Sequence, residues 1–341
     1  MATIKKEGVL LEKTTLGFEN LGVMNPAVIK TDGKIHLFYR AVRQGNNSTI
    51  GYARLSDPTT VEYRMDVPIL FPQFDYESQG LEDPRICQID GLFYLSYTAF
   101  NGISALGALA ISKDLIAFKK VGIMVPIINF EAFRILAESR SKINEKYVRY
   151  NNPYTQSRAA NEKAILWDKN VVFFPRKIEG KFHFIHRVRP DIQLVRVTEL
   201  VELTPEFWQN YFLHLNDWIM MTAKYPHEAS YIGGGCPPIE TKDGWLLIYH
   251  GVHDTIHGYV YTACAALFDL DNPLIELGRL KIPLFSPEED YEKTGFVNNV
   301  CFPTGAIVEN DTLFIYYGAA DERIACASLS LSSLITELKT A

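Results

Sequence analysis

The sequence predicts an all-β fold, a five-bladed β-propeller in which residues 1–341 form a single domain. Three observations predict it. Similar segments occur five times along the chain, each segment carries a hairpin signal, and their spacing leaves room for about four strands per unit. A series of hairpins can also form a β-sandwich. A polar signature that returns at the same strand position favours radial symmetry, and therefore the propeller.

Each copy of the repeat has a proline near its start, then a short apolar stretch, a turn and an aromatic-rich stretch. The copies span 25–42, 82–100, 173–189, 236–252 and 301–321. The prolines that align them are Pro26, Pro84, Pro175, Pro238 and Pro303. Four of the five turns contain an acidic residue followed by glycine, which is the strongest short-range hairpin signal. Each copy therefore predicts two antiparallel strands.

The interval between the second and third copies is longer than the others and predicts an insertion at about 126–160. Residues 129–152 are rich in good helix formers, and Phe130, Phe133, Ile135 and Leu136 lie on a loosely apolar side. We therefore expect a helical excursion between blades two and three. It would cover the channel mouth, contact another subunit of a homo-oligomer, or pack on its own blade.

The composition is typical of a globular protein with a substantial core: 47% of the residues are hydrophobic, 22% are charged, and the net charge is -6. Dispersed basic residues predict neither a nucleic-acid partner nor a membrane partner. The start of the sequence has no signal-peptide pattern, and no run approaches 18 apolar residues. Five scattered cysteines predict no disulfide framework and no metal site, so a cytoplasmic location fits best.

Polar residues at matching positions of the repeats predict a site on the propeller axis, because the first strand of each blade lines the central channel. These residues are Asn25, Arg40, Asp83, Arg176, Lys177, His186, Arg187, His250 and Asp321. Taken singly, each is more often a solvent-exposed residue at a strand end, but their repetition in register favours function. An acid that faces a cationic group suits a reaction that consumes phosphate on a neutral sugar. The segment 233–238 lacks the residues of a phosphate-binding nucleotide loop.

Several motifs in the same order resemble glycoside hydrolase family 130. They read "NPAVI" with "YRA", "GLEDPRI", "FFPRK", "GGGCPPI" with "GWLLIYHGV", and "FPTGAIV". The resemblance runs from about residue 22 to residue 328. It implies a five-bladed β-propeller and the activity of an inverting β-mannoside phosphorylase.

The resemblance also implies a mechanism in which Asp83 is the general acid. This aspartate would act through the 3-hydroxyl of the bound mannose, which passes its proton to the glycosidic oxygen. Inorganic phosphate would be the co-substrate and attack the anomeric carbon from the opposite face, with no cofactor. The products would be α-mannose 1-phosphate and a shortened acceptor. Phosphate is already a nucleophile, so it needs positioning and charge compensation in place of a base.

Carried over by motif, the remaining site residues fall into two groups. The phosphate candidates are Arg176, Lys177, His186, Arg187 and His250. The candidates for holding mannose or the acceptor are Asn25, Arg40, Asn47, Ser48, Glu82, Arg85 and Asp321. The sequence leaves open the linkage that is cleaved and the acceptor sugar.

Two other functions compete with phosphorolysis. An inverting β-1,2-mannosidase would use water and need a second carboxylate as a base, for which Glu228 in "YPHEASYIGGG" is the candidate. A non-catalytic glycan-binding propeller would explain the abundant aromatic residues, but not an acid facing a cationic group. The basic residues of "PRK", "HR" and "YHG" favour the phosphorylase.

Overall fold

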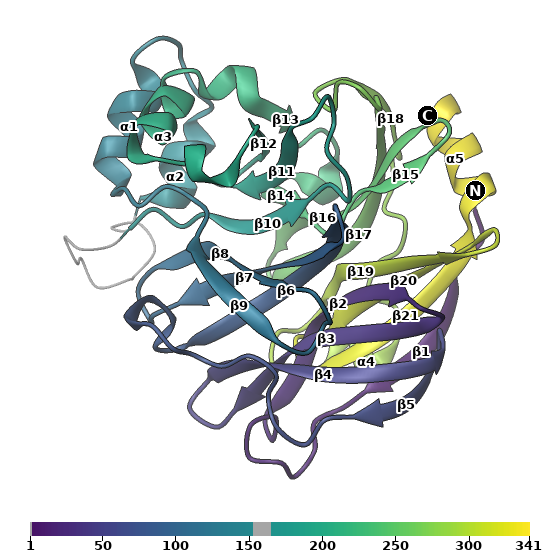
Figure 1. The fold of residues 1–341 in the computed structure, drawn as a ribbon. Coiled ribbons are helices and arrows are strands. Elements are labelled where there is room, and N and C mark those ends of the chain that lie inside the picture. Colours follow the sequence, from purple (N-terminus) through teal and green to yellow (C-terminus); the bar gives the residue numbers. More distant parts are fainter. Residues whose placement is uncertain (1, 153–164) are drawn as a thin grey trace.

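The computed structural model describes residues 2–152 and 165–341. The fold is mostly β, with strands in several sheets and a cluster of helices beside one of them (Figure 1). The strands from residue 22 onward fall into five consecutive groups along the chain, and the first strand, β1 (Lys5–Leu11), joins the last of them. We number these strand groups one to five.

Strand groups one and two belong to the same sheet. Group one contains β2 (Gly22–Thr31), β3 (Lys34–Arg43), β4 (Asn47–Asp57) and β5 (Thr60–Arg64). Group two contains β6 (Gly80–Ile89), β7 (Leu92–Phe100), β8 (Ala105–Ser112) and β9 (Phe118–Ile123). Within each group neighbouring strands are antiparallel. A parallel pairing of Ser48 with Gly80 joins β4 to β6 and so connects the two groups.

The other three groups are separate sheets. Group three contains β10 (Lys169–Phe173), β11 (Phe182–Arg187), β12 (Ile192–Val197) and β13 (Ile219–Met221). Group four contains β14 (Tyr231–Gly234), β15 (Ile239–Thr241), β16 (Gly244–Thr255), β17 (Gly258–Phe268) and β18 (Glu276–Arg279). Group five contains β19 (Cys301–Glu309), β20 (Thr312–Ala319), β21 (Arg323–Ser330) and β1 (Lys5–Leu11). Because β1 pairs with β21, the first and last strands of the chain lie side by side (Figure 1).

The predicted hairpins are confirmed, and the turn residues explain them. Asp32 and Gly33 connect β2 to β3, with φ of 49° and 72°. Asp90 and Gly91 connect β6 to β7, with φ of 50° and 79°. Two consecutive positive φ values are what a type I′ turn requires, and aspartate followed by glycine adopts them at low cost.

A bulge interrupts β2, β6, β10 and β19, and in the first three of these strands it contains a residue with positive φ. The pairing register shifts between Met24 and Ala27 in β2, between Glu82 and Arg85 in β6, and between Lys169 and Val172 in β10. A residue with positive φ lies inside each shift. These residues are Asn25, Asp83 and Asn170, with φ of 52°, 48° and 57°. A bulge re-aims a side chain out of the regular strand alternation, and all three side chains line the same cavity.

The predicted insertion contains two helices in its described part, α1 (Phe130–Glu138) and α2 (Glu145–Asn151). Residues 153–160 of the predicted span lie outside the described residues. Helix α1 begins at Asn129, whose side chain accepts a hydrogen bond from the amide of Ala132.

The other helices lie outside this insertion. They are α3 (Pro205–Leu213), α4 (Asp290–Lys293) and α5 (Leu331–Thr340). Phe133 of α1 is fully buried against Phe212 of α3, so the insertion packs on a helix that the sequence did not predict. None of the helices in the described ranges is long and apolar enough to cross a bilayer.

Candidate active site

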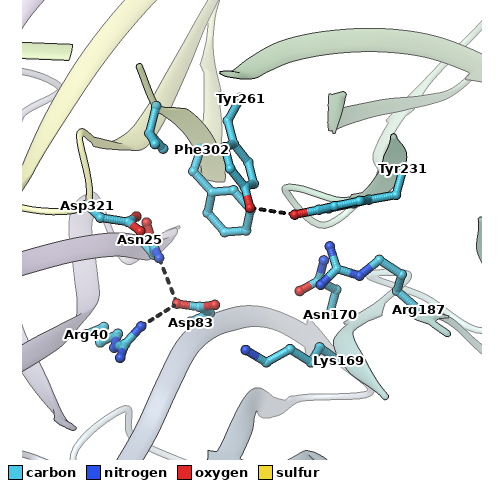
Figure 2. A pocket seen from close by; sticks show the side chains of 11 residues that line it. Asn25, Arg40, Asp83, Lys169, Asn170, Arg187, Tyr231, Tyr261, Phe302 and Asp321 are labelled. Atoms are coloured by element: carbon cyan, nitrogen blue, oxygen red, sulfur yellow. Dashed lines mark hydrogen bonds and ion pairs between the residues drawn. The ribbon is translucent and has the colours of Figure 1, made fainter. Parts of the chain in front are cut away.

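All five strand groups contribute walls to one cavity of about 160 Å³. Figure 2 shows these residues facing a common space. The walls are Asn25, Arg40, Asp83, Lys169, Asn170, Arg187, Tyr231, Tyr261, Val300, Phe302 and Asp321. A cavity with walls from every group can bring together residues that are far apart in the sequence.

One side of the cavity is built around Asp83. The amide of Asn25 donates a hydrogen bond of 2.7 Å to Asp83 Oδ1, and Arg40 Nη1 lies 3.8 Å from the same oxygen (Figure 2). Beneath them, Glu82 pairs with Arg40 Nη2 at 2.8 Å and with Lys169 Nζ at 3.2 Å. Glu82 therefore holds two cations of the cavity wall from behind, although it was predicted to contact substrate.

Two carboxyl groups line the cavity, and their surroundings shift their pKa values in opposite directions. Burial raises the pKa of Asp83, but the charges of Arg40, Lys169 and Arg85 outweigh it and hold the pKa of Asp83 below its ordinary value. Burial, followed by the nearby charge of Asp83, raises the pKa of Asp321 to about 6. In the free cavity Asp321 is therefore the carboxyl that retains its proton at mildly acidic pH.

The raised pKa of Asp321 gives a testable dependence of stability on pH. A carboxyl with a raised pKa stabilises the folded protein below its unfolded pKa, and this contribution is lost as pH rises through about 6. From pH 4 to pH 7, the free energy of unfolding should fall in the wild type relative to Asp321→Asn. The full shift implies roughly 3 kcal/mol, and we expect about 2 kcal/mol because the cavity is open to water. Urea denaturation at several pH values measures the difference, and a constant difference would contradict the assignment.

The opposite side of the cavity presents cations and hydrogen-bond donors. Arg187 and Asn170 lie there, and Lys169 extends from the same strand group toward Asp83 (Figure 2). Arg187 is 8% exposed, and its Nε has no hydrogen-bond partner among the described residues. The same is true of the buried Asn170 Nδ2. Burial and the neighbouring Arg189 lower the pKa of Arg187. Unpaired donors at a buried cation are suited to an anionic ligand.

His250 lies behind this cationic side and does not line the cavity. Its Nε2 lies 3.1 Å from Nη1 of Arg187, which donates the hydrogen bond. Burial, together with the charges of Arg187 and Arg85, lowers the pKa of His250 well below its ordinary value. A neutral His250 therefore orients Arg187 from behind the cavity wall and does not lie in the predicted position of a direct ligand contact.

Aromatic residues form the remaining wall. The hydroxyls of Tyr231 and Tyr261 lie 2.5 Å apart, and the guanidinium of Arg187 stands 5.2 Å from the Tyr231 ring (Figure 2). On its other side, Tyr231 meets the edge of Tyr150 from α2, with ring centroids 5.9 Å apart. The insertion thus supports the wall of the cavity next to the cationic side.

The structure corrects the predicted placement of Arg176 and Lys177. Arg176 pairs with Glu240 at 2.8 Å on the outer surface, where 40% of its side chain is exposed. Lys177 pairs with Asp90 at 3.2 Å. Both residues follow β10 instead of lying within its bulge, because the proline of the third copy is not equivalent to the prolines of the first two copies.

Pairing across the strands shows which residues are equivalent. Met24 pairs with Arg40 in group one, and Lys169 pairs with Arg187 in group three. Each pair lies directly before the bulge of its first strand. The run "DKNVVFF" therefore corresponds to "VMNPAVI", and aligning the apolar runs instead of the prolines would have found Lys169 and Asn170.

The structure also corrects the placement of Glu228 and His186. Four strand groups contain a buried tyrosine–glutamate triad, in which a tyrosine hydroxyl donates to a fully buried glutamate that also pairs with a cation. The triads are Tyr39–Glu19–Arg64, Tyr97–Glu77–Lys120, Tyr249–Glu228–Arg279 and Tyr317–Glu292–Lys6.

Glu228 is thus one of four equivalent structural glutamates, and it does not line the cavity. It also accepts hydrogen bonds from the amides of Lys224 and Tyr225. A carboxylate with these partners has no access to a water molecule in the cavity. His186 occupies the corresponding tyrosine position of group three and is fully buried, so it does not contact a ligand.

The remaining predicted residues lie near the cavity without lining it. Ser48 accepts a hydrogen bond of 2.9 Å from Nε of Arg40. Arg85 is 2% exposed and donates to the carbonyl oxygens of Asp83 and Gly235, so it holds the bulge of β6 in place. Asn47 donates to the carbonyl of Gly45 at the start of β4. Asn25, Arg40 and Asp321 do line the cavity, as expected.

One group of metal-type donors lies close together in the part of the chain that the structure describes. It consists of His227, Glu228 and Cys264, all buried. Glu228 is already paired with Arg279, whose Nη1 lies 3.4 Å away, and a cation in that position disfavours a metal ion. The group does not fit a metal site.

The central cavity has carboxylates on one side and buried cationic donors on the other. These features are those of an enzyme with a β fold that binds a polar ligand next to an anion. A family model described as beta-1,4-mannooligosaccharide phosphorylase, that of glycoside hydrolase family 130, matches residues 15–340, and the chain belongs to this family. The resemblance inferred from the sequence motifs is therefore confirmed.

Individual relatives are similar to this chain over most of their length. The chain is 32% identical to a 1,2-beta-oligomannan phosphorylase of Thermoanaerobacter sp. (strain X514), over 96% of both chains. It is 33% identical to a beta-1,2-mannobiose phosphorylase of the same organism, over 91% of this chain and 90% of that protein. The beta-1,2-mannobiose phosphorylase of Listeria innocua, solved with beta-1,2-mannobiose, has the same fold. Its TM-score is 0.74 at 24% identity, over 99% of this chain and all of that one.

Proposed function

We propose that the protein is an inverting β-mannoside phosphorylase, which transfers a mannosyl group to inorganic phosphate. The products are α-mannose 1-phosphate and a shortened acceptor. One observation carries the proposal. Across the cavity from Asp83, strand group three contributes Asn170 and Arg187, each of which has a buried donor without a partner among the described residues. The same group contributes Lys169, which extends toward Asp83 (Figure 2). The named activities of the relatives support it.

Each side of the cavity has its own part in this reaction. Asp83 supplies the proton that reaches the leaving oxygen, by way of the 3-hydroxyl of the mannose. Arg187 and Lys169 compensate the charge of phosphate and orient it toward the anomeric carbon. Phosphate needs no base, so one carboxylic acid is enough.

Hydrolysis would require different residues on the cationic side. An inverting hydrolase places a second carboxylate roughly 6.5–9.5 Å from the acid so that it can activate water. The described walls opposite Asp83 carry cations, an amide and tyrosines, and Glu228 is buried in its triad with Tyr249 and Arg279. This arrangement supports phosphate over water as the nucleophile.

The lowered pKa of Asp83 in the free cavity is compatible with proton donation in the complex. Its pKa is depressed by Arg40, Lys169 and Arg85. A phosphate dianion bound at Lys169 and Arg187 would offset these cations, and a bound sugar would displace water. Both changes raise the pKa of a carboxyl group. We therefore propose that Asp83 becomes protonated when both substrates are bound.

The acceptor has a neighbouring space available. A second cavity of about 350 Å³ shares Arg40 and Asp321 with the first and lies on the side away from Arg187. Its walls include Phe296 and Val297, which are 53% and 41% exposed. An apolar ring beside charged groups suits a sugar, which presents both C–H faces and hydroxyls. We propose that the leaving sugar occupies this second cavity.

Replacing Phe296 by alanine is expected to raise the KM for the acceptor sugar about tenfold in the direction of synthesis. The loss of one aromatic contact accounts for an effect of this order. The KM for α-mannose 1-phosphate should stay within about twofold, since that substrate occupies the first cavity. Phe74→Ala is the matched control, because Phe74 is 46% exposed and lines neither cavity. An unchanged acceptor KM would place the acceptor elsewhere.

The linkage is proposed from the relatives. Both Thermoanaerobacter proteins are named for β-1,2-linked substrates, whereas the family model is described by β-1,4-linked ones. We propose β-1,2-linked mannosides as the substrate. The test is a panel of β-1,2- and β-1,4-mannosides in phosphate buffer, with α-mannose 1-phosphate measured. A glycan-binding protein would bind members of the panel without turnover.

The architecture and location are part of the same proposal. We propose that the five strand groups are the five blades of a propeller and that β1 closes the ring by joining group five. No cofactor is required in this scheme. All five cysteines are buried and free, which supports the reducing cytoplasm as the location.

A further inference from the structure

Strand group three differs from the other groups at the position of the buried tyrosine. His186 replaces the tyrosine, since Arg187 is equivalent to Arg40 of group one. The partner of His186 is Asp168. Nδ1 of His186 lies 2.9 Å and 2.8 Å from the two carboxylate oxygens of Asp168, and Nε2 lies 2.9 Å from the hydroxyl of Tyr211. Both His186 and Asp168 are fully buried. Group three therefore has a charge-assisted bond that joins the residue directly before β10 to β11, where the other groups have a triad.

This pair lies directly behind the two cations of the cavity. Asp168 precedes Lys169 in the sequence, and His186 precedes Arg187. Lys169 and Arg187 are themselves opposite each other in the pairing of β10 with β11. One side-chain bond thus joins the two backbone segments that present both cations.

The pair is itself held in place from two directions. The amide of Asp168 donates to the carbonyl of Ala105 at 3.1 Å, and its carbonyl accepts from the amide of Gly107 at 2.8 Å. Tyr211 of α3 also donates to the carbonyl of Leu194 at 2.9 Å. Strand group two and helix α3 therefore both fix the position of the bond between Asp168 and His186.

The position of the Arg187 side chain depends on its backbone more than the position of Arg40 does. Arg40 is held by the carboxylate of Glu82 and by the hydroxyl of Ser48. Among the described residues, Arg187 has no ion pair, and its side chain contacts the neutral His250 and the Tyr231 ring. Its guanidinium therefore takes its position largely from the strand end that His186 fixes.

We infer that Asp168 and His186 are the positioning pair of the phosphate site: they hold the strand ends of Lys169 and Arg187 at the spacing that binds phosphate. Arg187 depends on this bond more than Lys169 does, because Lys169 Nζ is also paired with Glu82. The inference rests on the proposed phosphorolysis. Lys169 and Arg187 carry like charges, which repel each other. Without the bond between Asp168 and His186, the two strand ends that carry them would be free to separate. Bonds of this indirect kind, which orient a ligand-binding group, affect affinity by roughly 10–100-fold in metal sites.

The test compares variants of His186 by steady-state kinetics. His186→Asn retains an N–H donor at the place of Nδ1, whereas His186→Phe keeps the ring and removes both bonds. We expect His186→Phe to raise the KM for phosphate about tenfold and to leave the KM for the mannoside within about twofold. His186→Asn should recover most of the affinity for phosphate.

A matched control separates positioning from general stability. Tyr97→Phe removes the corresponding bond in group two, where the following residue, Thr98, does not line the cavity. It should lower the melting temperature without changing either KM. If His186→Phe fails to fold, Asp168→Asn serves in its place, since it keeps an acceptor for Nδ1 and removes the charge.

The outcomes distinguish the inference from the proposed function. If the wild type requires phosphate but His186→Phe, or Asp168→Asn in its place, leaves the KM for phosphate unchanged, the positioning role is refuted. The positioning role is also refuted if the KM values for phosphate and for the mannoside rise alike. It is likewise refuted if His186→Asn has as high a KM for phosphate as His186→Phe. A wild type that turns over without phosphate would refute the proposed function itself.

Discussion

Replacing Asp83 by asparagine is expected to lower kcat on an unactivated β-mannoside by about 10²–10⁴-fold, the usual contribution of a positioned proton donor. Asparagine keeps the shape of the side chain and can still pair with the amide of Asn25, so the fold and mannoside binding should persist. The rate should be measured under saturating phosphate. A mannoside with a good leaving group should lose much less activity, because it needs less protonation.

Asp321→Asn is the informative comparison for this prediction. Asp321 shares the cavity with Asp83 and has the higher pKa in the free protein. If Asp83 is the donor, Asp321→Asn should retain more activity and show the same sensitivity to the leaving group as the wild type. The assignment would be reversed if Asp321→Asn lost turnover more severely and an activated substrate rescued it.

Replacing Arg187 by alanine is expected to raise the KM for phosphate by about ten- to a hundredfold. A hydrogen bond to a charged group contributes roughly 1.5–3 kcal/mol, and Arg187 has an Nε donor with no partner among the described residues. The KM for the mannoside should change little, since Arg187 lies opposite Asp83 (Figure 2). Initial rates over a range of phosphate concentrations give both constants.

Arg176→Ala is the matched control for Arg187→Ala. Both changes remove an arginine from strand group three or the segment that follows it, but Arg176 pairs with Glu240 on the surface. An exposed ion pair is worth little, so neither KM nor stability should change appreciably. If Arg176→Ala weakened phosphate binding as much as Arg187→Ala, the cavity would not be the phosphate site.

The hairpins could be predicted from sequence because their signals are local. Aspartate followed by glycine between apolar runs specifies a turn through the φ values of two residues alone, as at Asp32–Gly33 and Asp90–Gly91. Helix α3 was missed although Thr204 and Pro205 form a local helix start signal. Its apolar residues Trp208 and Phe212 pack against the insertion helices, so its hydrophobic side became interpretable only with the packing partner in place.

The candidate site could be predicted only in part, because its geometry depends on bulges. Asn25 and Asp83 were found because a proline marks the bulge in each of their strands. In β10 the corresponding bulge has Val171 after Asn170, and the proline comes later in the chain. The alignment by prolines therefore selected Arg176 over Lys169. A single sequence does not show which residue of a strand leaves the regular pairing.

Residues behind the cavity were also misplaced, for a related reason. Glu228 and His186 are polar and lie next to apolar runs, as catalytic residues often do. Their role depends on tertiary partners distant in sequence, such as Arg279 for Glu228 and Tyr211 for His186. In the sequence, a polar residue whose hydrogen bonds are made inside the core cannot be distinguished from one that faces a ligand.

The most direct test of phosphorolysis is to follow mannoside cleavage with and without inorganic phosphate while recording ³¹P NMR spectra. If Arg187 and Lys169 bind phosphate as the nucleophile, cleavage should require phosphate, and one α-mannose 1-phosphate should appear for each bond broken. Free mannose released at the same rate in both reactions, with no phosphate ester, would contradict the account and assign water as the nucleophile.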